Sequence, residues 1–251
     1  MTIEEFFKLH KRVVVAVSGG VDSAVLLSLA LDYAREVYPC FVKTAFQPAF
    51  ELQDAERICG DMNVKLNILG ADIFSDNNIV KNPPDRCYYC KKQIFSKIFD
   101  FADAVKADAV MEGTNASDDI RDRAGYKVLG ELGVLSPLRL CGLKKSDVRD
   151  IARKRGICVS EKPSYACLAT RIPTGERITK NILEKTEKAE NELFKLGFSD
   201  FRIRFHDGDA KLQINENDFE RLVKNKNLVL DVLAPYYNNI LLDLRGREND
   251  G

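Results

Sequence analysis

The sequence of 251 residues contains no run of about 18 apolar residues, the length a helix needs to cross a membrane. Its start, MTIEEFFKLHKR, lacks the apolar core of a secretory signal peptide. Neither sign of charge is in excess, because 38 Lys and Arg balance 38 Asp and Glu, so composition does not indicate a nucleic-acid binder. We therefore expect a cytoplasmic globular protein with small-molecule partners, no membrane association and no nucleic-acid partner.

The cysteines do not fit a disulfide framework. There are seven, an odd number, and no export signal points to an oxidising compartment. The two histidines, His10 and His206, have no metal-ligand spacing near the cysteines, so a closed four-ligand zinc site is hard to assemble. Metal or thiolate chemistry is therefore the better hypothesis for the cysteines.

Short apolar runs alternate with helical patterns in the N-terminal part of the chain. The run VVVAV, residues 13–17, is β-branched and unbroken by polar residues, as expected of a parallel strand buried on both faces. The alternation predicts an α/β fold with a doubly wound parallel sheet. Further strands are expected over 41–45, 64–69 and 108–113, and helices over 23–37, 51–62, 89–105 and 145–155.

A smaller second domain is expected after this sheet. Residues 161–179 contain two prolines and no clean period, which predicts a loop that joins two domains and enters the active site. A helix capped by Thr179, the strands FRIRF, KLQI and ILLDL, and a helix over 218–236 then indicate a small α+β domain. We place the larger domain at 1–165 and the smaller one, for substrate binding or oligomerisation, at 166–251.

The sharpest motif is SGGVDS, residues 18–23, between the first strand and its helix. Two glycines allow a tight turn close to phosphate, and the helix offers unpaired N–H groups to an anion. The carboxylate of Asp22 would repel that anion unless a cation such as Mg²⁺ lies between them. The motif predicts a nucleotide phosphate site built from Ser18, Gly19, Gly20, Asp22 and Ser23.

Two other phosphate motifs are absent from the sequence. There is no G-x-x-x-x-G-K-[ST], so a loop that handles a γ-phosphate is excluded. No G-x-G-x-x-G follows the first strand, so dinucleotide binding is not predicted.

Three cysteines are candidates for a cluster site. Cys87 and Cys90, in RCYYCKK, can chelate one metal or cluster, although a redox pair has the same spacing. Cys167, in the irregular loop PSYACLATR, is the third candidate. Three thiolates would hold three irons of a [4Fe–4S] cluster and leave the fourth open to a hydrosulfide. The remaining cysteines are expected to be small buried hydrophobic residues: Cys40, Cys59, Cys141 and Cys158.

The phosphate motif resembles the PP-loop of the adenine-nucleotide α-hydrolases, which use ATP to adenylate an oxygen and release pyrophosphate. The wider pattern resembles the LarE family, the ATP-dependent sulfur transferases of nickel-pincer nucleotide synthesis. The resemblance covers nearly the whole chain and is most specific in ACLATRIPTGERIT. It rests on VSGGVDSAVL, NPPDRCYYCKKQIF, EGTNASDDIRDRAG, SPLRLCGLKKSDVRDIAR, KPSYACLATRIPTGERIT, and FRIRFHDGDAKLQI through LLDLRG.

The resemblance implies ATP, Mg²⁺ and a nucleotide substrate, pyridinium-3,5-biscarboxylic acid mononucleotide, whose carboxylates become thiocarboxylates. In one branch of the family the cysteine matching Cys167 gives up its own sulfur. Another branch has an additional C-x-x-C and is thought to use a [4Fe–4S] cluster with a transferable sulfide. With Cys87 and Cys90 present, this chain resembles the cluster branch. Sulfide or a sulfur donor is then a partner, and a homo-oligomer is expected.

Chemistry and resemblance together suggest further site residues. Lys91 could neutralise phosphate or the adenylate. Residues 112–118 follow a strand at the edge where ligands bind in such sheets. There Glu112 and Asp118 are candidate Mg²⁺ ligands, with Asn115 nearby, and Gly113 and Thr114 are candidate nucleotide contacts. For the substrate phosphate we expect Arg171, which would face the pocket of Cys167, and a fork of Arg202 and Arg204 with Arg245 or Arg247.

Other functions share parts of this pattern. A tRNA-thiolating enzyme uses the same loop and a similar cluster, but needs a basic surface and usually an RNA-binding module, neither of which is found. An amidating ligase would leave the cysteines unexplained. A non-catalytic nucleotide or iron–sulfur sensor and a sacrificial use of Cys167 remain open.

Overall fold

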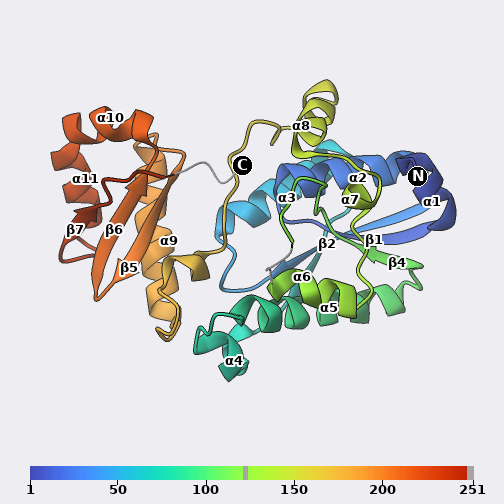
Figure 1. Cartoon of the computed structure of the whole chain (residues 1–251), viewed down its shortest axis with the longest axis horizontal. Helices are drawn as coiled ribbons and strands as arrows, with labels where there is room; N and C mark the ends of the chain where they lie inside the picture. The colour runs from blue at the N-terminus through green and yellow to red at the C-terminus, as the bar shows by residue number, and fades with distance from the viewer. Residues whose placement is uncertain (121–123, 248–251) are drawn as a thin grey trace. The chain divides into compact units, whose positions relative to one another are not determined.

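The computed structural model describes residues 1–120 and 124–247, so part of the motif EGTNASDDIRDRAG and the last four residues lie outside it. The chain forms two compact units (Figure 1). Unit 1 comprises Met1–Ile79 and Asp85–Lys162, and unit 2 comprises Val80–Pro84 together with the chain from Pro163 onward. Among the described residues, no helix is long and apolar enough to span a membrane.

Unit 1 is built on a four-stranded parallel sheet with strand order β3-β2-β1-β4. Val14 in the central strand pairs with Tyr38 on one side and Val110 on the other. The residues Val13–Val15 are fully buried, which confirms the interpretation of VVVAV as a strand covered on both faces. The strands are β1 (Arg12–Ala16), β2 (Glu36–Lys43), β3 (Asn67–Gly70) and β4 (Ala109–Met111).

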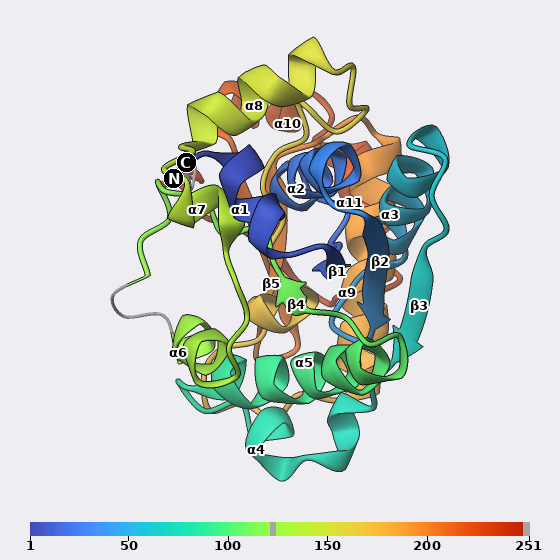
Figure 2. The ribbon, with the colours of Figure 1, turned by 90° about the vertical axis from the view of Figure 1, so that its right-hand side faces the viewer.

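Helices cover both faces of this sheet, so the predicted doubly wound α/β fold is confirmed. Val13 and Val15 pack into one hydrophobic cluster with α1 and α2, while Val14 packs into another with α5 and α6. Figures 1 and 2 show these helix pairs on opposite sides of the strands. The helices of unit 1 are α1 (Ile3–Leu9), α2 (Val21–Tyr33), α3 (Ala49–Asp61), η1 (Ile73–Ser75), α4 (Asn77–Val80), α5 (Arg86–Ala104), α6 (Ala124–Glu131), α7 (Pro137–Leu140) and α8 (Lys145–Lys154).

The expected helix over 23–37 was wrong at its end, because α2 stops at Tyr33 and β2 already begins at Glu36. Pro39 lies inside β2 opposite Val15. A proline argues against a strand in sequence terms, since it cannot donate a ladder hydrogen bond. The residues of β2 before Phe41 were therefore not predicted to form a strand.

Two glycines let the loop between β1 and α2 pack against its neighbours. Gly19 has a φ of +75°, and a Cβ there would lie 2.5 Å from the carbonyl oxygen of Glu51 in α3. Gly113 follows β4, and a Cβ there would lie 2.8 Å from the backbone nitrogen of Ser23. The loop is therefore wedged between α3 and the end of β4, at positions where any side chain would displace it.

Unit 2 contains a three-stranded mixed sheet with order β5-β6-β7, as expected of a small α+β domain. β5 and β6 are antiparallel and are joined by Asp207 and Gly208, both with positive φ, while β6 and β7 are parallel. The helix expected over 218–236 is divided into α10 and α11 at Asn225. The elements are η2 (Leu168–Arg171), α9 (Lys180–Lys195), β5 (Phe201–His206), β6 (Asp209–Ile214), η3 (Glu216–Asp218), α10 (Phe219–Lys224), α11 (Lys226–Leu233) and β7 (Ile240–Leu242).

A buried ion pair between Arg171 and Glu190 joins η2 to α9 within unit 2. The Nε of Arg171 lies 2.7 Å from Oε1 of Glu190, with side chains 0% and 1% exposed. Arg171 also donates to the carbonyl of Ala166, and Glu190 accepts hydrogen bonds from the Tyr165 hydroxyl and from the backbone N–H of Ile203. Burial opposes the charge of Arg171, but Glu190 outweighs it and raises the arginine pKa.

Arg171 was expected to bind substrate, and this expectation has to be corrected. Its guanidinium is fully buried and bonded within the protein, so it positions the loop that carries Cys167 instead of facing a ligand.

Replacing Arg171 by Met should lower the free energy of unfolding by about 3–5 kcal/mol, because Glu190 then stays buried without its partner. Urea denaturation measures the change. Glu184→Gln is the matched control, since Glu184 forms an exposed pair with Lys180 on the same helix and should leave the urea midpoint unchanged. An unchanged midpoint for Arg171→Met would contradict the structural role.

Gly113→Ala should lower the free energy of unfolding by about 1–3 kcal/mol and weaken ATP binding, because the new methyl group pushes on the loop backbone. Thermal unfolding and titration with a fluorescent ATP analogue check both effects. Gly130→Ala is the control, since nothing lies within 4 Å of a Cβ at this helical position. Wild-type ATP affinity in Gly113→Ala would argue against the packing described.

Candidate functional site

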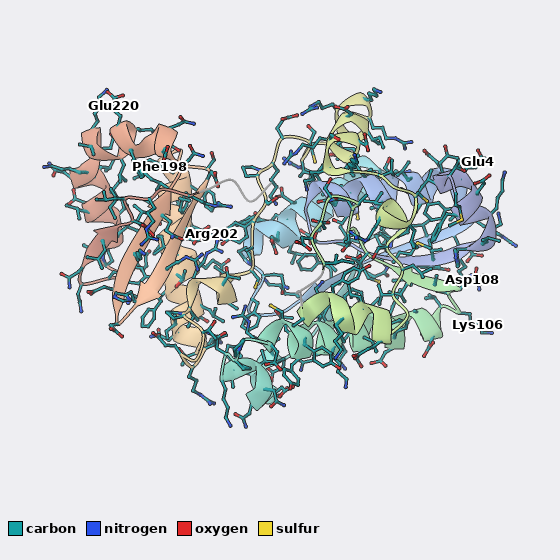
Figure 3. All side chains as sticks on the ribbon, viewed as in Figure 1. Glu4, Lys106, Asp108, Phe198, Arg202 and Glu220 are labelled. Carbon is teal, nitrogen blue, oxygen red and sulfur yellow. The ribbon has the colours of Figure 1, made fainter. Side chains whose placement is uncertain are left out.

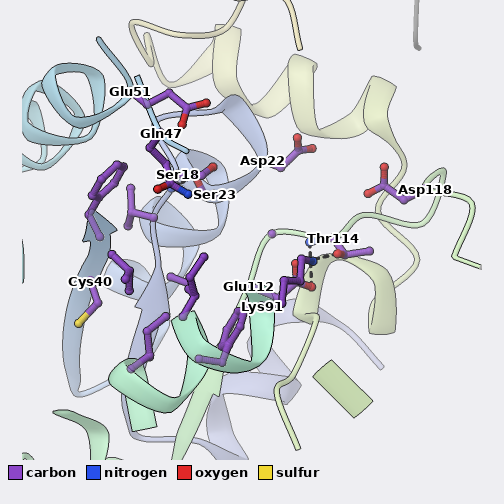
Figure 4. A pocket seen from close by; sticks show the side chains of 18 residues that line it. Ser18, Asp22, Ser23, Cys40, Gln47, Glu51, Lys91, Glu112, Thr114 and Asp118 are labelled. Carbon is purple, nitrogen blue, oxygen red and sulfur yellow. Dashed lines mark hydrogen bonds between the residues drawn. The ribbon is translucent and has the colours of Figure 1, made fainter. Parts of the chain in front are cut away.

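A cavity of about 320 Å³ opens at the carboxyl ends of β1, β2 and β4, the edge at which ligands bind in open α/β sheets (Figure 4). Residues of β2 and α5 give it an apolar part that includes Phe41, Val42 and Phe95. The loop of residues 18–23, called the phosphate-type loop below, and the segment after β4 give the cavity a polar part. The sequence-predicted residues that line it are Ser18, Asp22, Ser23, Lys91, Glu112, Gly113, Thr114 and Asp118.

The loop of residues 18–23 is held in shape by its own serines. The hydroxyl of Ser23 accepts a hydrogen bond from the backbone N–H of Ser18 at 3.1 Å and donates to the carbonyl of Gly20 at 3.0 Å. The N-cap residue of α2 is Gly20, which has no side chain to bond the first turn of the helix. The N–H groups of this turn can therefore serve an anion, as the motif predicted.

The carboxylate of Asp22 is held from two sides. Its Oδ1 accepts a hydrogen bond from Nδ2 of Asn115 at 3.0 Å, and its Oδ2 lies 2.6 Å from Nζ of Lys145. Asn115 is 1% exposed and was among the predicted site residues. Lys145 was missed, because a lysine at the start of an amphipathic helix is ordinarily a solvated residue.

Two further acids lie beside the loop. Glu112 accepts two hydrogen bonds from the backbone and hydroxyl of Thr114 (Figure 4). It accepts a third from the hydroxyl of Ser136. Asp118 accepts one, at 2.9 Å, from the backbone N–H of Asn115. Within residues 1–120 and 124–247, no three His, Cys, Asp or Glu side chains gather as a metal site. The carboxylates fit a hard cation such as Mg²⁺, and Asp118 has more oxygen capacity to spare than Glu112.

A second lysine was missed by sequence reasoning. Nζ of Lys162 lies 2.6 Å from Oδ2 of Asp54 in α3 and donates to the carbonyl of Gly19 at 3.1 Å. It thereby joins the end of unit 1 to the phosphate-type loop. The contact links residues 143 positions apart, which no local pattern could indicate.

Cys87 and Cys90 both lie in the first turns of α5, because the helix begins at Arg86, earlier than the expected Tyr89. Cys87 is exposed, and the guanidinium of Arg86 lies 3.7 Å from its Sγ. A Cβ on Gly125 of α6 would lie 3.1 Å from Lys91 and 3.5 Å from Cys87, so this glycine lets α6 pack closely against the cysteine face.

Cys167 belongs to unit 2, where it precedes η2 and is half-buried. Its carbonyl accepts hydrogen bonds from the backbone N–H of Thr170 at 3.0 Å and from the Thr170 hydroxyl at 2.9 Å. Arg204 donates in turn to the carbonyl of Thr170 at 2.8 Å. The thiol is thus carried on a short loop with fixed backbone bonds.

The other four cysteines differ in burial. Cys40 and Cys59 are buried, and burial raises their thiol pKa values to about 12 and about 11. The prediction that they are small buried residues is confirmed. Cys141 is half-buried, and burial raises its pKa. For Cys158 the prediction was wrong, because this cysteine lies exposed in a turn.

Unit 2 has a basic cavity of about 440 Å³ over β5 and β6. Figure 3 shows Arg202 on this sheet, and Arg204 follows it on the same strand. Hydrogen bonds from Lys211 and Gln213 lower the pKa of Asp243, the acid within the cavity, so that it stays charged. The cations that line the cavity are Arg202, Arg204, Lys211, Arg245 and Arg247.

The arginines of this cavity are oriented by neighbouring groups. Nε of Arg204 donates to Gln213 at 2.5 Å, and Arg247 forms an ion pair with Asp200. The predicted fork of Arg202, Arg204 and Arg247 thus lies in one cavity, and Arg245 lies there too. Lys211 was missed, although strand register with Arg204 places it beside the fork.

Known proteins are similar to this chain over different lengths. The model of the family "Queuosine biosynthesis protein QueC" matches residues 12–82, which include the phosphate-type loop. A tRNA-specific 2-thiouridylase MnmA of Shewanella halifaxensis is 29% identical over 64% of this chain and 53% of its own length. These matches are partial.

Other relatives, among them the following two, match this chain almost end to end. An uncharacterised protein of Synechocystis is 29% identical, covering 98% of this chain and 94% of its own. The pyridinium-3,5-bisthiocarboxylic acid mononucleotide synthase of Lactiplantibacillus plantarum is 30% identical, covering 99% of this chain and 93% of its own. With the parallel sheet, the SGGVDS loop and the cavity beside it, this similarity shows that the chain belongs to the LarE family of PP-loop ATP pyrophosphatases.

Proposed function

We propose that this protein uses ATP to adenylate the carboxylates of pyridinium-3,5-biscarboxylic acid mononucleotide and converts them to thiocarboxylates, a step of nickel-pincer nucleotide synthesis. The observation that carries the proposal is the length of the similarity to the synthase, which spans both units. It thus includes the basic cavity of unit 2 as well as the ATP-binding fold.

Unit 1 supplies the nucleotide chemistry. The apolar part of its cavity suits adenine, and the loop N–H groups suit the pyrophosphate. Asp22 and Asp118 would hold Mg²⁺, which neutralises the phosphates, and Lys91 lies in the same cavity. A substrate carboxylate oxygen then bonds to the α-phosphorus and pyrophosphate leaves. Sulfide next attacks the acyl carbon, and AMP departs with that oxygen.

Unit 2 supplies a site for the substrate phosphate. Among the residues that the structure describes, five cations line the basic cavity beside one acid, Asp243. Paired guanidinium groups bind phosphate by two parallel hydrogen bonds, and Arg202 and Arg204 lie two residues apart on one strand face. Arg204 also holds the Thr170 carbonyl, so the phosphate site and the Cys167 loop share a residue.

For the sulfur we propose a role for three thiolates, those of Cys87, Cys90 and Cys167. Thiolate is the usual ligand of iron–sulfur clusters, and Cys87 and Cys90 share the N-terminal turns of α5. When bound, a [4Fe–4S] cluster on these residues would supply an open iron that carries sulfide. The alternative is that Cys167 gives up its own sulfur.

tRNA thiolation is the second candidate, favoured by the similarity to the 2-thiouridylase. That similarity covers only 64% of the chain. A filter-binding assay with tRNA separates the two functions, because the mononucleotide synthase has no need to retain tRNA.

Replacing any one of Cys87, Cys90 or Cys167 by Ala should abolish bound iron and sulfur transfer but spare ATP binding, because each removes one thiolate ligand. Iron and sulfide analysis after anaerobic purification measures this. Cys158→Ala is the control, since it removes an exposed thiol outside the proposed site. Dehydroalanine at position 167 after turnover, seen by mass spectrometry, would instead establish the sacrificial route.

Arg202→Gln should raise the KM for the mononucleotide by about tenfold or more, because one charge-assisted bond to its phosphate is lost. The KM for ATP should not change, since ATP binds in unit 1. Steady-state pyrophosphate release measures both values. Arg221→Gln is a control arginine in the same unit, on α10 and outside the cavity. Equal KM values for Arg202→Gln and wild type would remove the phosphate role.

A further inference from the structure

Lys145 is the partner of the one acid in the PP-loop, and sequence reasoning assigned it no role. Its Nζ lies 2.6 Å from Oδ2 of Asp22, with side chains 20% and 26% exposed. Its backbone is fixed at the first position of α8, where its N–H donates to the hydroxyl of Ser117 at 3.1 Å. A short, half-buried pair of this kind is more constrained than a surface ion pair.

The pair lies where a polyphosphate has to bind. Asp22 is in the first turn of α2, and the N–H groups of this turn would bind the phosphate of a nucleotide. A phosphate there lies within a few Å of the Asp22 carboxylate, and two negative charges at such a distance repel strongly. In the structure, the ammonium group of Lys145 lies against this carboxylate and can supply the balancing charge.

The two side chains that contact Asp22 differ in how freely they can move. Asn115 is 1% exposed, and its Oδ1 also accepts from the N–H of Ser117, so it is locked in place. Lys145 reaches Asp22 with a flexible four-carbon chain, and its Nζ is a point charge that can turn to a new acceptor. Asn115 can thus hold Oδ1 of Asp22 while Oδ2 changes partner.

We propose that Lys145 is a nucleotide-binding residue that exchanges Asp22 for the polyphosphate when Mg·ATP binds. The Asp22 carboxylate would then hold Mg²⁺, and Nζ of Lys145 would donate to a phosphate oxygen. Lys145 therefore pairs first with the Asp22 carboxylate and then with a phosphate group of the nucleotide. This inference rests on the PP-loop ATP chemistry of the proposed function, but not on the identity of the sulfur acceptor.

The test is a double-mutant cycle of Lys145→Met and Asp22→Asn, read by binding of α,β-methylene-ATP with Mg²⁺. If Lys145 contacts phosphate, Lys145→Met weakens binding by about 10- to 100-fold even when Asp22 is already Asn. Adenosine, which has no phosphate, should bind all four proteins equally. Because the ligand is not hydrolysed, the result is independent of sulfur transfer.

Lys154→Met is the matched control, since Lys154 is exposed in the last turn of the same helix. It should bind α,β-methylene-ATP like wild type. If Lys145→Met has no effect in the Asp22→Asn background, Lys145 acts only through Asp22 and the exchange is overturned. A loss of adenosine binding that equals the loss of α,β-methylene-ATP binding would also overturn it. A failure of the sulfur-transfer proposal shows elsewhere, as ATP binding without thiocarboxylate formation.

Discussion

The site depends on one electrostatic constraint: a carboxylate, Asp22, stands inside a cradle built for phosphate. The N–H groups of α2 attract an anion, and Asp22 repels it, so the two are compatible only with a cation between them. In the structure, the ammonium group of Lys145 pairs with one oxygen of Asp22, while Asn115 fixes the other. The surrounding fold keeps this arrangement in place. Gly19 and Gly113 let α3 and β4 approach the loop, and Lys162 bonds its backbone.

In the proposed function, the two units divide the chemistry between them. Unit 1 has the cavity proposed for ATP and a pair of cysteines on α5. Unit 2 has Cys167 on a loop tied by Arg171 and Arg204, beside a cavity rich in arginine. Arg204 joins the proposed phosphate site to the cysteine loop through Thr170, so substrate binding and thiol position are linked by one side chain.

Most of the features that the sequence predicted correctly depend on residues that are neighbours in the chain. The motif SGGVDS predicted the turn after the first strand, and the β-branched run before it predicted the central strand of the sheet. Predictions weakened where long-range contacts decide the outcome. Lys145 and Lys162 reach partners more than a hundred residues away, and Pro39 hid the start of β2. Arg171 looked like a ligand, because its burial against Glu190 depends on a helix that follows much later.

In the proposed reaction, ATP turns a substrate carboxylate oxygen into a leaving group. The most direct test follows ¹⁸O from a labelled substrate carboxylate, with ATP and sulfide present. Transfer of the label to AMP, with pyrophosphate as the other product, is the predicted result. If AMP forms without the label, or if ADP and phosphate form instead, the carboxylate is not adenylated and the account fails.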